Sequence, residues 1–276
     1  MPKQHATAVA ASPVPDASPS TSQDGAGGVR SVQRALDILG LLTEDRPQIT
    51  IREIVDATGL AKTTVIRLTQ TLVQCGLLWA TSSGYTAGPG LWRWAHLARN
   101  AWELPPESRR RMREMADQQQ ETVNLYVRRD VHRVCIAQEE SPRALRHVVR
   151  VGDELPLWGG ASAKVLLRDA APDLLERVVA TAPAGSAGLD AASLGAAVAQ
   201  VAAAGYAVSH GERESGVSAV AVPLLQGDGT VVGALSLSGA TARFTPERVE
   251  QFVTALRAAA DAMTGRGTAL TAGGAG

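Results

Sequence analysis

The stretch from Thr50 to Cys75, with one glycine near its middle, constrains the fold of this chain more than any other part of the sequence. Thr50 and Glu53 can form a capping box, because the threonine hydroxyl can accept from the amide of Glu53 while the glutamate accepts from the amide of Thr50. The helix that begins there runs to Gly59, which tolerates the left-handed backbone of a tight turn. A second helix follows from about Ala61 to Cys75, so the stretch predicts two helices joined by a short turn.

The second of these helices is amphipathic. Its apolar residues recur three and four positions apart, as one buried face requires: Val65, Leu68 and Leu72. The opposite face is polar and comprises Thr63, Arg67, Gln70 and Gln74. This helix therefore offers a polar surface to something outside the fold.

Two flanking elements complete a small domain over residues 29–88. Ser31 can cap a first helix whose apolar residues follow the helical period from Val32 to Leu42. The sequence LLWATSSGYTA, residues 77–87, alternates around a Ser-Gly turn and predicts a hairpin. Three helices followed by a hairpin describe a winged helix-turn-helix, whose third helix can enter the DNA major groove.

The start of the third helix carries the side chains with which such a domain would meet DNA. Arg67 can bond guanine edges, Lys62 can reach phosphate, and the neighbouring threonines can contact either. Earlier helices supply two expected phosphate contacts, since helix starts attract anions. The candidate DNA-binding residues are therefore Arg34, Thr50, Lys62, Thr63, Thr64 and Arg67. The alternative is a solvated helix start with Arg67 on an exposed face.

The charge balance supports DNA binding only when the chain is divided. The whole chain has 27 Lys and Arg against 27 Asp and Glu. Residues 29–100 hold eight basic and five acidic residues, whereas residues 120–263 hold thirteen and sixteen. A basic cluster, ESRRRMRE, lies at 107–114. The N-terminal part is therefore the better partner for phosphate.

A further helix from Leu91 predicts a linker within residues 89–105. It ends at the sequence LPP, 104–106, and carries one apolar stripe: Leu91, Trp94, Ala95, Ala98, Ala101 and Trp102. The group Trp92, Trp94 and Trp102 admits two interpretations, a dimer interface or packing inside one chain.

Another helix is expected to begin near Glu107, and after it the sequence period changes to two. Strands are expected at 122–129, 132–139, 146–152, 206–212, 217–225 and 231–239. Helices are expected at 160–169, 172–180 and 191–205, and a last one at 245–263 with Thr245 as N-cap and Pro246 in its first turn. This order predicts an α+β domain with an antiparallel sheet over residues 106–263. Residues 1–28 and 264–276 have the composition of disordered tails.

Six stretches in this order resemble the IclR family of bacterial transcriptional regulators. They are SVQRALDIL, TGLAKTTVIRLTQTL, ETVNLYV, LPLWGGASAKVLL, GYAVSHGE and VSAVAVPL followed by ALSLSG. The resemblance covers nearly everything between Val29 and Met263. It implies a winged-helix DNA reader joined by a linker helix to a GAF-like domain that binds a small-molecule effector, in a homodimer or homotetramer.

The same resemblance implies which residues face the effector. These are Ala161, Ser162, Ser209, Ala219, Ser236 and Ser238. The amides of the GGASAK loop suit a carboxylate or other small anion. Other members often carry an acid or a cysteine where this chain has Ser209 and Ala219, so we expect a less charged pocket. Ser236 and Ser238 alternate in ALSLSG and admit a second interpretation, the polar face of an ordinary strand.

Three other features favour structural roles. Cys135 lies between Val134 and Ile136 and is expected to be buried rather than a redox sensor. His210 stands near Glu212 in sequence, which is a weak indication of chemistry. The glycine-rich stretch at 227–233 joins two expected strands and opens no helix, so it predicts a hairpin turn rather than a nucleotide loop.

The sequence gives no sign of catalysis. It has no G-x-S-x-G elbow and no metal-ligand spacing, so we expect no catalytic site, metal or cofactor. Two rival hypotheses stay open: a C-terminal domain that turns over a small metabolite through Ser162 or His210, and one that only mediates assembly. No apolar run of about 18 residues and no signal-peptide core is present, so a cytoplasmic location is expected.

Overall fold

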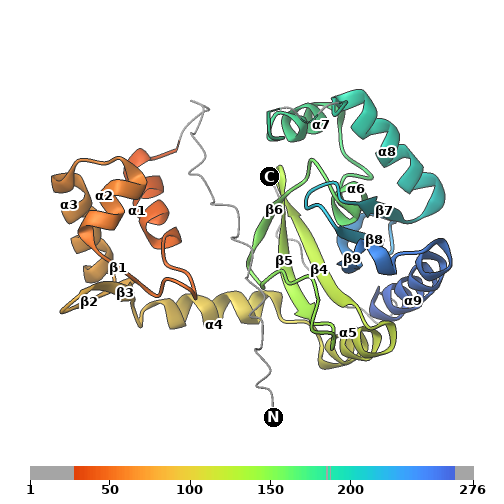
Figure 1. Ribbon diagram of the computed structural model, residues 1–276, viewed down its shortest axis with the longest axis horizontal. Coiled ribbons are helices and arrows are strands. Elements are labelled where there is room, and N and C mark those ends of the chain that lie inside the picture. Colours follow the sequence, from red (N-terminus) through yellow and green to blue (C-terminus); the bar gives the residue numbers. More distant parts are fainter. Residues whose placement is uncertain (1–27, 185, 187, 265–276) are drawn as a thin grey trace, which may run out of the picture. The chain divides into compact units, whose positions relative to one another are not determined.

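The computed structural model describes residues 28–184, 186 and 188–264, and the chain divides between Ala101 and Trp102 into two compact units (Figure 1). Apart from Gly28 and Thr264, the two predicted tails lie outside the described residues. The predicted α+β class is confirmed, with a winged helix-turn-helix in the first unit and an antiparallel sheet in the second.

The N-terminal unit is built from helices and a small antiparallel sheet with strand order β1-β3-β2. Its elements are α1 (Arg30–Gly40), β1 (Gln48–Ile49), α2 (Ile51–Thr58), α3 (Lys62–Gln74), β2 (Leu78–Thr81), β3 (Gly84–Ala87) and α4 (Leu91–Trp102). Its core is a cluster of buried aliphatic side chains: Ile38, Ile49, Ile54, Val65, Leu72 and Leu78. One apolar face from each helix of the motif thus meets the sheet.

The helix-turn-helix forms as its sequence predicts. The hydroxyl of Thr50 accepts from the amide of Glu53 at 3.2 Å, and the carboxylate of Glu53 accepts from the amide of Thr50 at 2.7 Å. Gly59 ends α2 with a φ of +66°. Two details differ from the prediction. Helix α1 begins at Arg30 after Val29, so Ser31 lies inside its first turn and does not cap it. The strand β1 was not predicted, because two residues carry no period.

The C-terminal unit has a six-stranded antiparallel sheet with strand order β6-β5-β4-β9-β8-β7. Its elements are α5 (Pro106–Gln119), β4 (Thr122–Arg129), β5 (His132–Glu139), β6 (Glu154–Pro156), α6 (Ala161–Leu166), α7 (Pro172–Val179), α8 (Ala191–Ala204), β7 (Ala207–His210), β8 (Val217–Leu225), β9 (Val231–Ala240), the 3-10 helix η1 (Thr241–Arg243) and α9 (Pro246–Thr264). Most of these follow the predicted ranges.

The strand expected at 146–152 is wrong. The chain there is irregular and ends in a turn, in which the amide of Asp153 donates to the carbonyl of Arg150 at 3.0 Å. Pairing with β5 becomes regular only at Glu154. The alternation of the valines arises because Val149 packs beside Cys135 in the core while Val148 is exposed.

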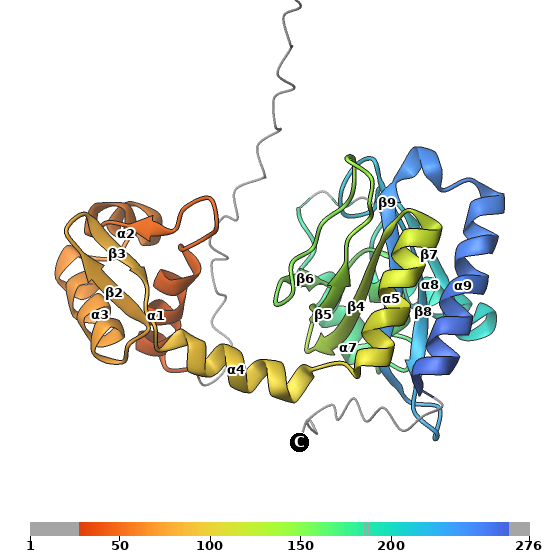
Figure 2. The ribbon, with the colours of Figure 1, turned by 90° about the horizontal axis from the view of Figure 1, so that it is seen from below.

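The sheet is covered on both faces. Figure 2 shows α5 and α9 on one face, while α6, α7 and α8 lie on the other. The pleat of β9 divides its side chains between them: Leu235 and Leu237 enter the α5 and α9 side, whereas Ser236 and Ser238 point to the opposite side. The α6 face of the sheet therefore receives small polar side chains, and a pocket forms there.

Candidate functional site

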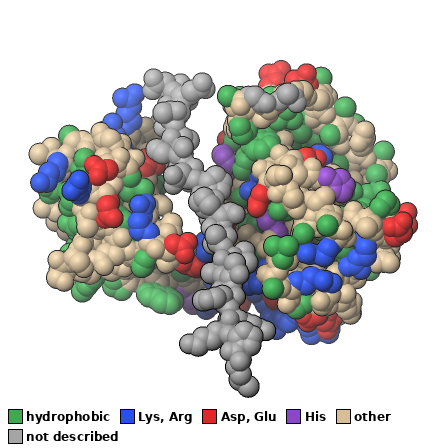
Figure 3. All heavy atoms as spheres, viewed as in Figure 1, with side chains coloured by type: hydrophobic (Ala, Val, Ile, Leu, Met, Phe, Trp, Pro, Cys, Tyr) green, Lys and Arg blue, Asp and Glu red, His purple; other side chains and the backbone are tan. Residues whose placement is uncertain are grey.

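The N-terminal candidates gather mainly at the start of α3. Lys62, Thr63 and Arg67 are exposed, and Thr64 is half-buried. No side chain of the described residues caps this helix, whose first intrahelical hydrogen bonds run from Thr64 and Val65 to the carbonyl of Ala61. The first amides of α3 therefore point outward without a helical acceptor, which suits a phosphate. In Figure 3, basic side chains lie over the part of this unit formed by α2 and α3, with acidic side chains between them.

The other two N-terminal candidates stand apart from α3. Thr50 begins α2, where its hydroxyl is engaged by the capping box with Glu53. Arg34 is exposed on α1, and no hydrogen bond or ion pair among the described residues joins it to the other five candidates. The structure thus brings four of the six together, and Thr50 has a competing structural role.

The C-terminal candidates all line one cavity of about 440 Å³, its open mouth included, on the α6 face of the sheet. These are Ala161, Ser162, Ser209, Ala219, Ser236 and Ser238. Gly160, from the GGASAK loop expected to face the effector, also lines the cavity. Sequence reasoning missed the remaining wall residues: Tyr126, Arg133, His147, Leu155, Glu212, Arg213, Glu214, Val217 and Ser218.

The register of the sheet explains why a cavity exists at this place. Ser209 pairs with Ala219 across β7 and β8, and Ala219 pairs with Ser238 across β8 and β9. Thr122 continues the row on β4 as the partner of Ser238. Residues opposite one another in antiparallel strands share a face, so four small side chains stand in one line. Their small volume leaves space under α6.

Ser236 and Ser238 are a polar strand face, and that face lines the cavity. Their side chains are 2% and 4% exposed, so contact with bulk solvent is not the reason for polar residues at these positions. Ser238 accepts a hydrogen bond from Asn124 at 3.0 Å, and the Oδ1 atom of Asn124 is buried with no hydrogen-bond partner among the described residues. The two sequence interpretations of these serines therefore coincide.

The loop amides that we expected to hold an anion are already occupied. The amide of Gly160 donates to the Glu212 carboxylate at 2.9 Å, and the amide of Ala161 donates to the Ser209 hydroxyl at 3.0 Å. Lys164 also forms an ion pair with Glu212. The carboxylate at the start of α6 thus belongs to the protein itself.

The pocket wall also carries charged groups that the sequence analysis did not name as pocket residues. The small residues at positions 209 and 219 are present, but charged groups enter from other elements: Arg133 from β5, and Glu212, Arg213 and Glu214 from the turn between β7 and β8. The sequence signal that could have found Arg133 is a lone arginine in strand β5, directly before its apolar run from Val134 to Ala137.

Arg133 is the most unusual group in the pocket wall. It is 4% exposed, and its Nη1 donates to the carbonyls of Pro156 at 2.6 Å and Gly159 at 3.0 Å. Its guanidinium lies 5.5 Å from the ring centroid of Tyr126, as in a cation–π contact. Burial lowers the pKa of Arg133 to about 10, which still leaves it charged at neutral pH.

His147 contacts the polar row at Ser238. Its Nδ1 lies 3.1 Å from the Ser238 hydroxyl, and its Nε2 lies 3.6 Å from a Glu214 oxygen and 3.3 Å from Arg213 Nη2. Burial lowers the pKa of His147, and the nearby Arg213 lowers it further. The imidazole is therefore neutral at neutral pH.

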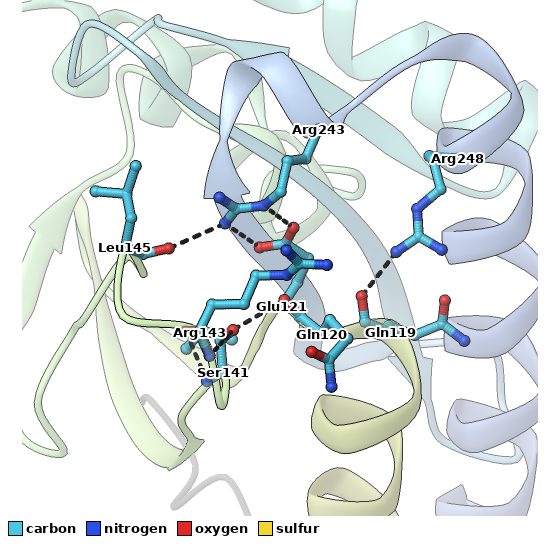
Figure 4. A network of polar contacts seen from close by, with 9 residues as sticks. Gln119, Gln120, Glu121, Ser141, Arg143, Leu145, Arg243 and Arg248 are labelled. Atoms are coloured by element: carbon cyan, nitrogen blue, oxygen red, sulfur yellow. Dashed lines mark hydrogen bonds and ion pairs between the residues drawn. The ribbon is translucent and has the colours of Figure 1, made fainter.

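A second polar network fixes the irregular segment that carries His147 (Figure 4). Arg243 forms a bidentate ion pair with the buried carboxylate of Glu121 and donates to the carbonyl of Leu145 at 3.3 Å. The hydroxyl of Ser141 donates to the carbonyl of Gln120 at 2.8 Å. The segment lacks strand pairing, so these side-chain contacts hold it in place.

The features expected to be structural behave as such. Cys135 is fully buried, and burial raises the pKa of its thiol to about 12. His210 contacts Ser218 at 2.9 Å, whereas the carboxylate of Glu212 binds Lys164 and Gly160, so the two residues form no pair. Residues 227–233 contain the turn that joins β8 to β9, with Gly229 at φ +85°.

Two further observations apply only to the part of the chain that the structure describes. No three His, Cys, Asp or Glu side chains come together there as ligands for a metal ion. No helix there has the length and apolar character that crossing a bilayer needs.

Comparisons with known proteins match both units. The family model of the IclR helix-turn-helix domain matches residues 31–79, and that of the bacterial transcriptional regulator IclR C-terminal domain matches residues 99–264. The regulator KdgR of Escherichia coli K12 is 31% identical over 84% of this chain and 90% of its own. The crystal structure of an IclR-family regulator from Rhodococcus is 40% identical, covers 89% of this chain and 97% of its own, and has a TM-score of 0.57. That of an IclR regulator from Alicyclobacillus acidocaldarius is 29% identical, covers 87% and 99%, and has a TM-score of 0.71.

Proposed function

We propose, on the premise that this chain belongs to the IclR family of bacterial transcriptional regulators, that it represses its target genes until a small molecule fills the cavity of its C-terminal unit. The chain is a DNA-binding regulator under effector control. Repression is the simpler direction, because occupancy of an operator suffices to exclude polymerase, whereas activation needs a further contact surface.

The observation that carries this proposal is the uncapped, exposed start of α3. Lys62, Thr63 and Arg67 present one cation-rich turn with outward-pointing amides, while Val65 and Leu72 anchor the other face in the core. A recognition helix needs this division, because its N-terminal side chains must reach base edges from a rigid support. In the proposal, Thr64, Arg34 and Thr50 add contacts to the operator.

Effector control requires that the ligand bind with different free energies to the DNA-bound and the DNA-free protein. The ligand must alter operator affinity, typically by about 1–3 kcal/mol, and the operator must alter ligand affinity by the same factor. In the proposal, the ligand touches the six candidate side chains of the cavity: Ala161, Ser162, Ser209, Ala219, Ser236 and Ser238. Linker helix α4 supplies the interface of a homodimer, through exposed tryptophans.

A catalytic role for the cavity is disfavoured by its hydrogen bonds. Ser238 and His147 form a hydroxyl–imidazole pair, which alone resembles a nucleophile with its base. Hydrolytic chemistry commonly uses free backbone amides to hold an oxyanion. The nearby amides of Gly160 and Ala161 donate instead to Glu212 and Ser209. We therefore propose that the cavity binds its ligand without converting it.

The test is selection of DNA sequences bound by the full chain, followed by titration of the enriched site. We expect a palindromic site that Arg67→Ala binds at least about tenfold more weakly, with relaxed sequence preference, because a bidentate base contact is lost. Gln74→Ala, at the far end of the same exposed helix face, is the matched control and should bind as the wild type does. Absence of any enriched site in the wild type would overturn the proposal.

A further inference from the structure

We infer that Gly88 and Gly90 are positioning residues that set the spacing of the operator half-sites, because they hold the start of linker helix α4 against the end of α3. The inference deepens the proposed function and rests on it, since it concerns how the same DNA-binding unit reads its site. It assigns a role to a short connection, residues 88–90, that has no polar side chain.

The connection between the hairpin and α4 is short and stiff. Strand β3 ends at Ala87 and α4 begins at Leu91, so residues 88–90 alone join them. The ring of Pro89 fixes its own φ, which removes one backbone freedom at the centre of the connection. The amide of Leu91 donates to the carbonyl of Gly88 at 3.1 Å, so the connection leads directly into the first turn of α4.

Two backbone hydrogen bonds tie this connection to the chain that leaves α3. Helix α3 ends at Gln74, and Gly76 then turns the chain with a φ of +73°. The amide of Gly90 donates to the carbonyl of Gly76 at 2.9 Å, and the amide of Gly88 donates to the carbonyl of Leu77 at 2.8 Å. Donors and acceptors all belong to the main chain, so the attachment does not depend on a flexible side chain.

Glycine is needed here because the two backbones pack directly on one another. A Cβ at Gly88 would stand 2.8 Å from the carbonyl carbons of Gly76 and Leu77. A Cβ at Gly90 would stand 2.7 Å from the carbonyl oxygen of Gly76 and 3.0 Å from its carbon. The atoms met are main-chain atoms, which cannot rotate away as a side chain can. Between the two helices there is thus no side chain that could repack, and α3 and α4 move as one body.

This rigid attachment matters for an operator with two half-sites. In the proposed homodimer α4 forms the interface, so the arrangement of the two α4 helices fixes the separation of the two α3 helices. Dimers of helix-turn-helix proteins read half-sites about one helical turn, or a multiple of it, apart. A flexible attachment would let each α3 reach its half-site independently. The rigid one selects a single spacing and passes any change in α4 on to α3.

The test begins with the palindromic site that the full chain enriches in DNA selection. Duplexes are made with one or two base pairs inserted at or removed from its centre, each of which turns one half-site by about 36° relative to the other. We expect the wild type to bind the original spacing at least about tenfold more tightly than a spacing changed by two base pairs. Fluorescence anisotropy titration measures each affinity.

Substitution at the connection should separate spacing from sequence reading. Gly90→Ala should bind all spacings within about threefold of one another, yet keep the wild-type preference for the half-site sequence, because α3 keeps its own contacts. A merely structural role would not move one preference without the other. Gly40→Ala is the matched control, since Gly40 ends α1 in the same unit and a Cβ there meets no atom within 4 Å. It should keep both preferences.

A second variant leaves the packed glycines untouched. Insertion of Gly-Ser between Gly90 and Leu91 adds no atom between the two backbones but frees α4 from the connection. It should lose the spacing preference as Gly90→Ala does. Hydrogen exchange of the wild type needs no variant and no DNA: the amides of Gly88 and Gly90 should exchange at least about a hundredfold more slowly than in an unstructured peptide.

Three results would overturn the inference: a wild type that binds all spacings alike, a spacing preference that persists in both Gly90→Ala and the insertion variant, or amides of Gly88 and Gly90 that exchange as in an unstructured peptide. If Gly90→Ala also loses the half-site sequence, its N-terminal unit is unfolded and the insertion variant decides. Absence of any enriched site in the wild type overturns the regulatory function instead, so the two failures are distinguishable.

Discussion

At the residue scale, Gly239 in strand β9 leaves the space that the side chains of Glu121 and Arg243 occupy. A Cβ there would stand 1.9 Å from Oε2 of Glu121 and 2.9 Å from Nη2 of Arg243. We expect Gly239→Ala to destabilise the C-terminal unit by about 1–3 kcal/mol, because the added methyl group forces the ion pair of Glu121 and Arg243 to shift. Urea unfolding measures this, with Gly227→Ala as control, since a Cβ at Gly227 meets no atom within 4 Å. Equal stability of the two variants would contradict the packing argument.

His147 gives the C-terminal unit a pH dependence whose direction follows from burial. Its pKa in the folded chain lies below the ordinary value of 6.5, so the unfolded chain takes up the proton first as pH falls. Stability is therefore complete above about pH 6.5 and decreases below it. Ser238, Arg213, Glu214 and Arg133 face the ring, and the two arginines oppose its protonation.

We expect His147→Gln to lose less free energy of unfolding than the wild type between about pH 7 and pH 5, by at most about 1.4 kcal/mol for each unit by which the pKa is lowered. His132→Gln, in a partly exposed position of β5, is the control and should behave as the wild type does. Parallel pH profiles for the wild type and His147→Gln would show that the imidazole is not desolvated.

At the scale of elements, α4 is a helix without a core. None of its residues is buried, and Trp92 and Trp94 are 80% and 58% exposed. Large aromatic side chains at this exposure favour the interface interpretation over packing inside one chain. We expect Trp94→Glu to raise the dissociation constant of the proposed dimer at least about tenfold, as measured by sedimentation velocity. Trp79 is equally exposed on strand β2, so Trp79→Glu is the control and should leave the dimer intact. If Trp94→Glu dimerised as tightly as the wild type, that result would contradict the proposal.

At the scale of the whole molecule, a net charge of zero conceals two units of opposite character. The N-terminal part carries the excess of basic residues and the C-terminal sheet domain the excess of acidic ones. Operator affinity should therefore fall with salt through contacts of the first unit alone. We expect Lys62→Ala to reduce the slope of log affinity against log salt concentration by about 1, with little change in sequence preference. Arg128→Gln, in the second unit, should leave that slope unchanged, and a reduced slope in this control would contradict the division.

The sequence by itself determined the elements whose causes are local. The capping box at Thr50 and the left-handed Gly59 depend on a few neighbouring residues, so both form as predicted. Strands at 122–129, 132–139 and 217–225 combine alternation or β-branched residues with clear turns, and their predicted ends match. The order of these elements, with the family resemblance, was sufficient to predict a DNA-reading unit and a ligand-binding unit.

Only the tertiary structure decided the features that neighbouring residues in the sequence do not determine. The residues at 146–152 alternate as in a strand. A turn from Arg150 to Asp153 and the hydrogen bond from Arg243 to Leu145 keep this segment irregular. Glu212 reaches the amide of Gly160 across 52 positions of sequence, so no short-range pattern predicts that the loop is occupied. Arg133 owes its character to what surrounds it, because its burial beside Tyr126 and the carbonyls of Pro156 and Gly159 is a property of the packed fold. The chemistry of the cavity is therefore set by long-range packing, whereas the frame that carries it is set by local sequence.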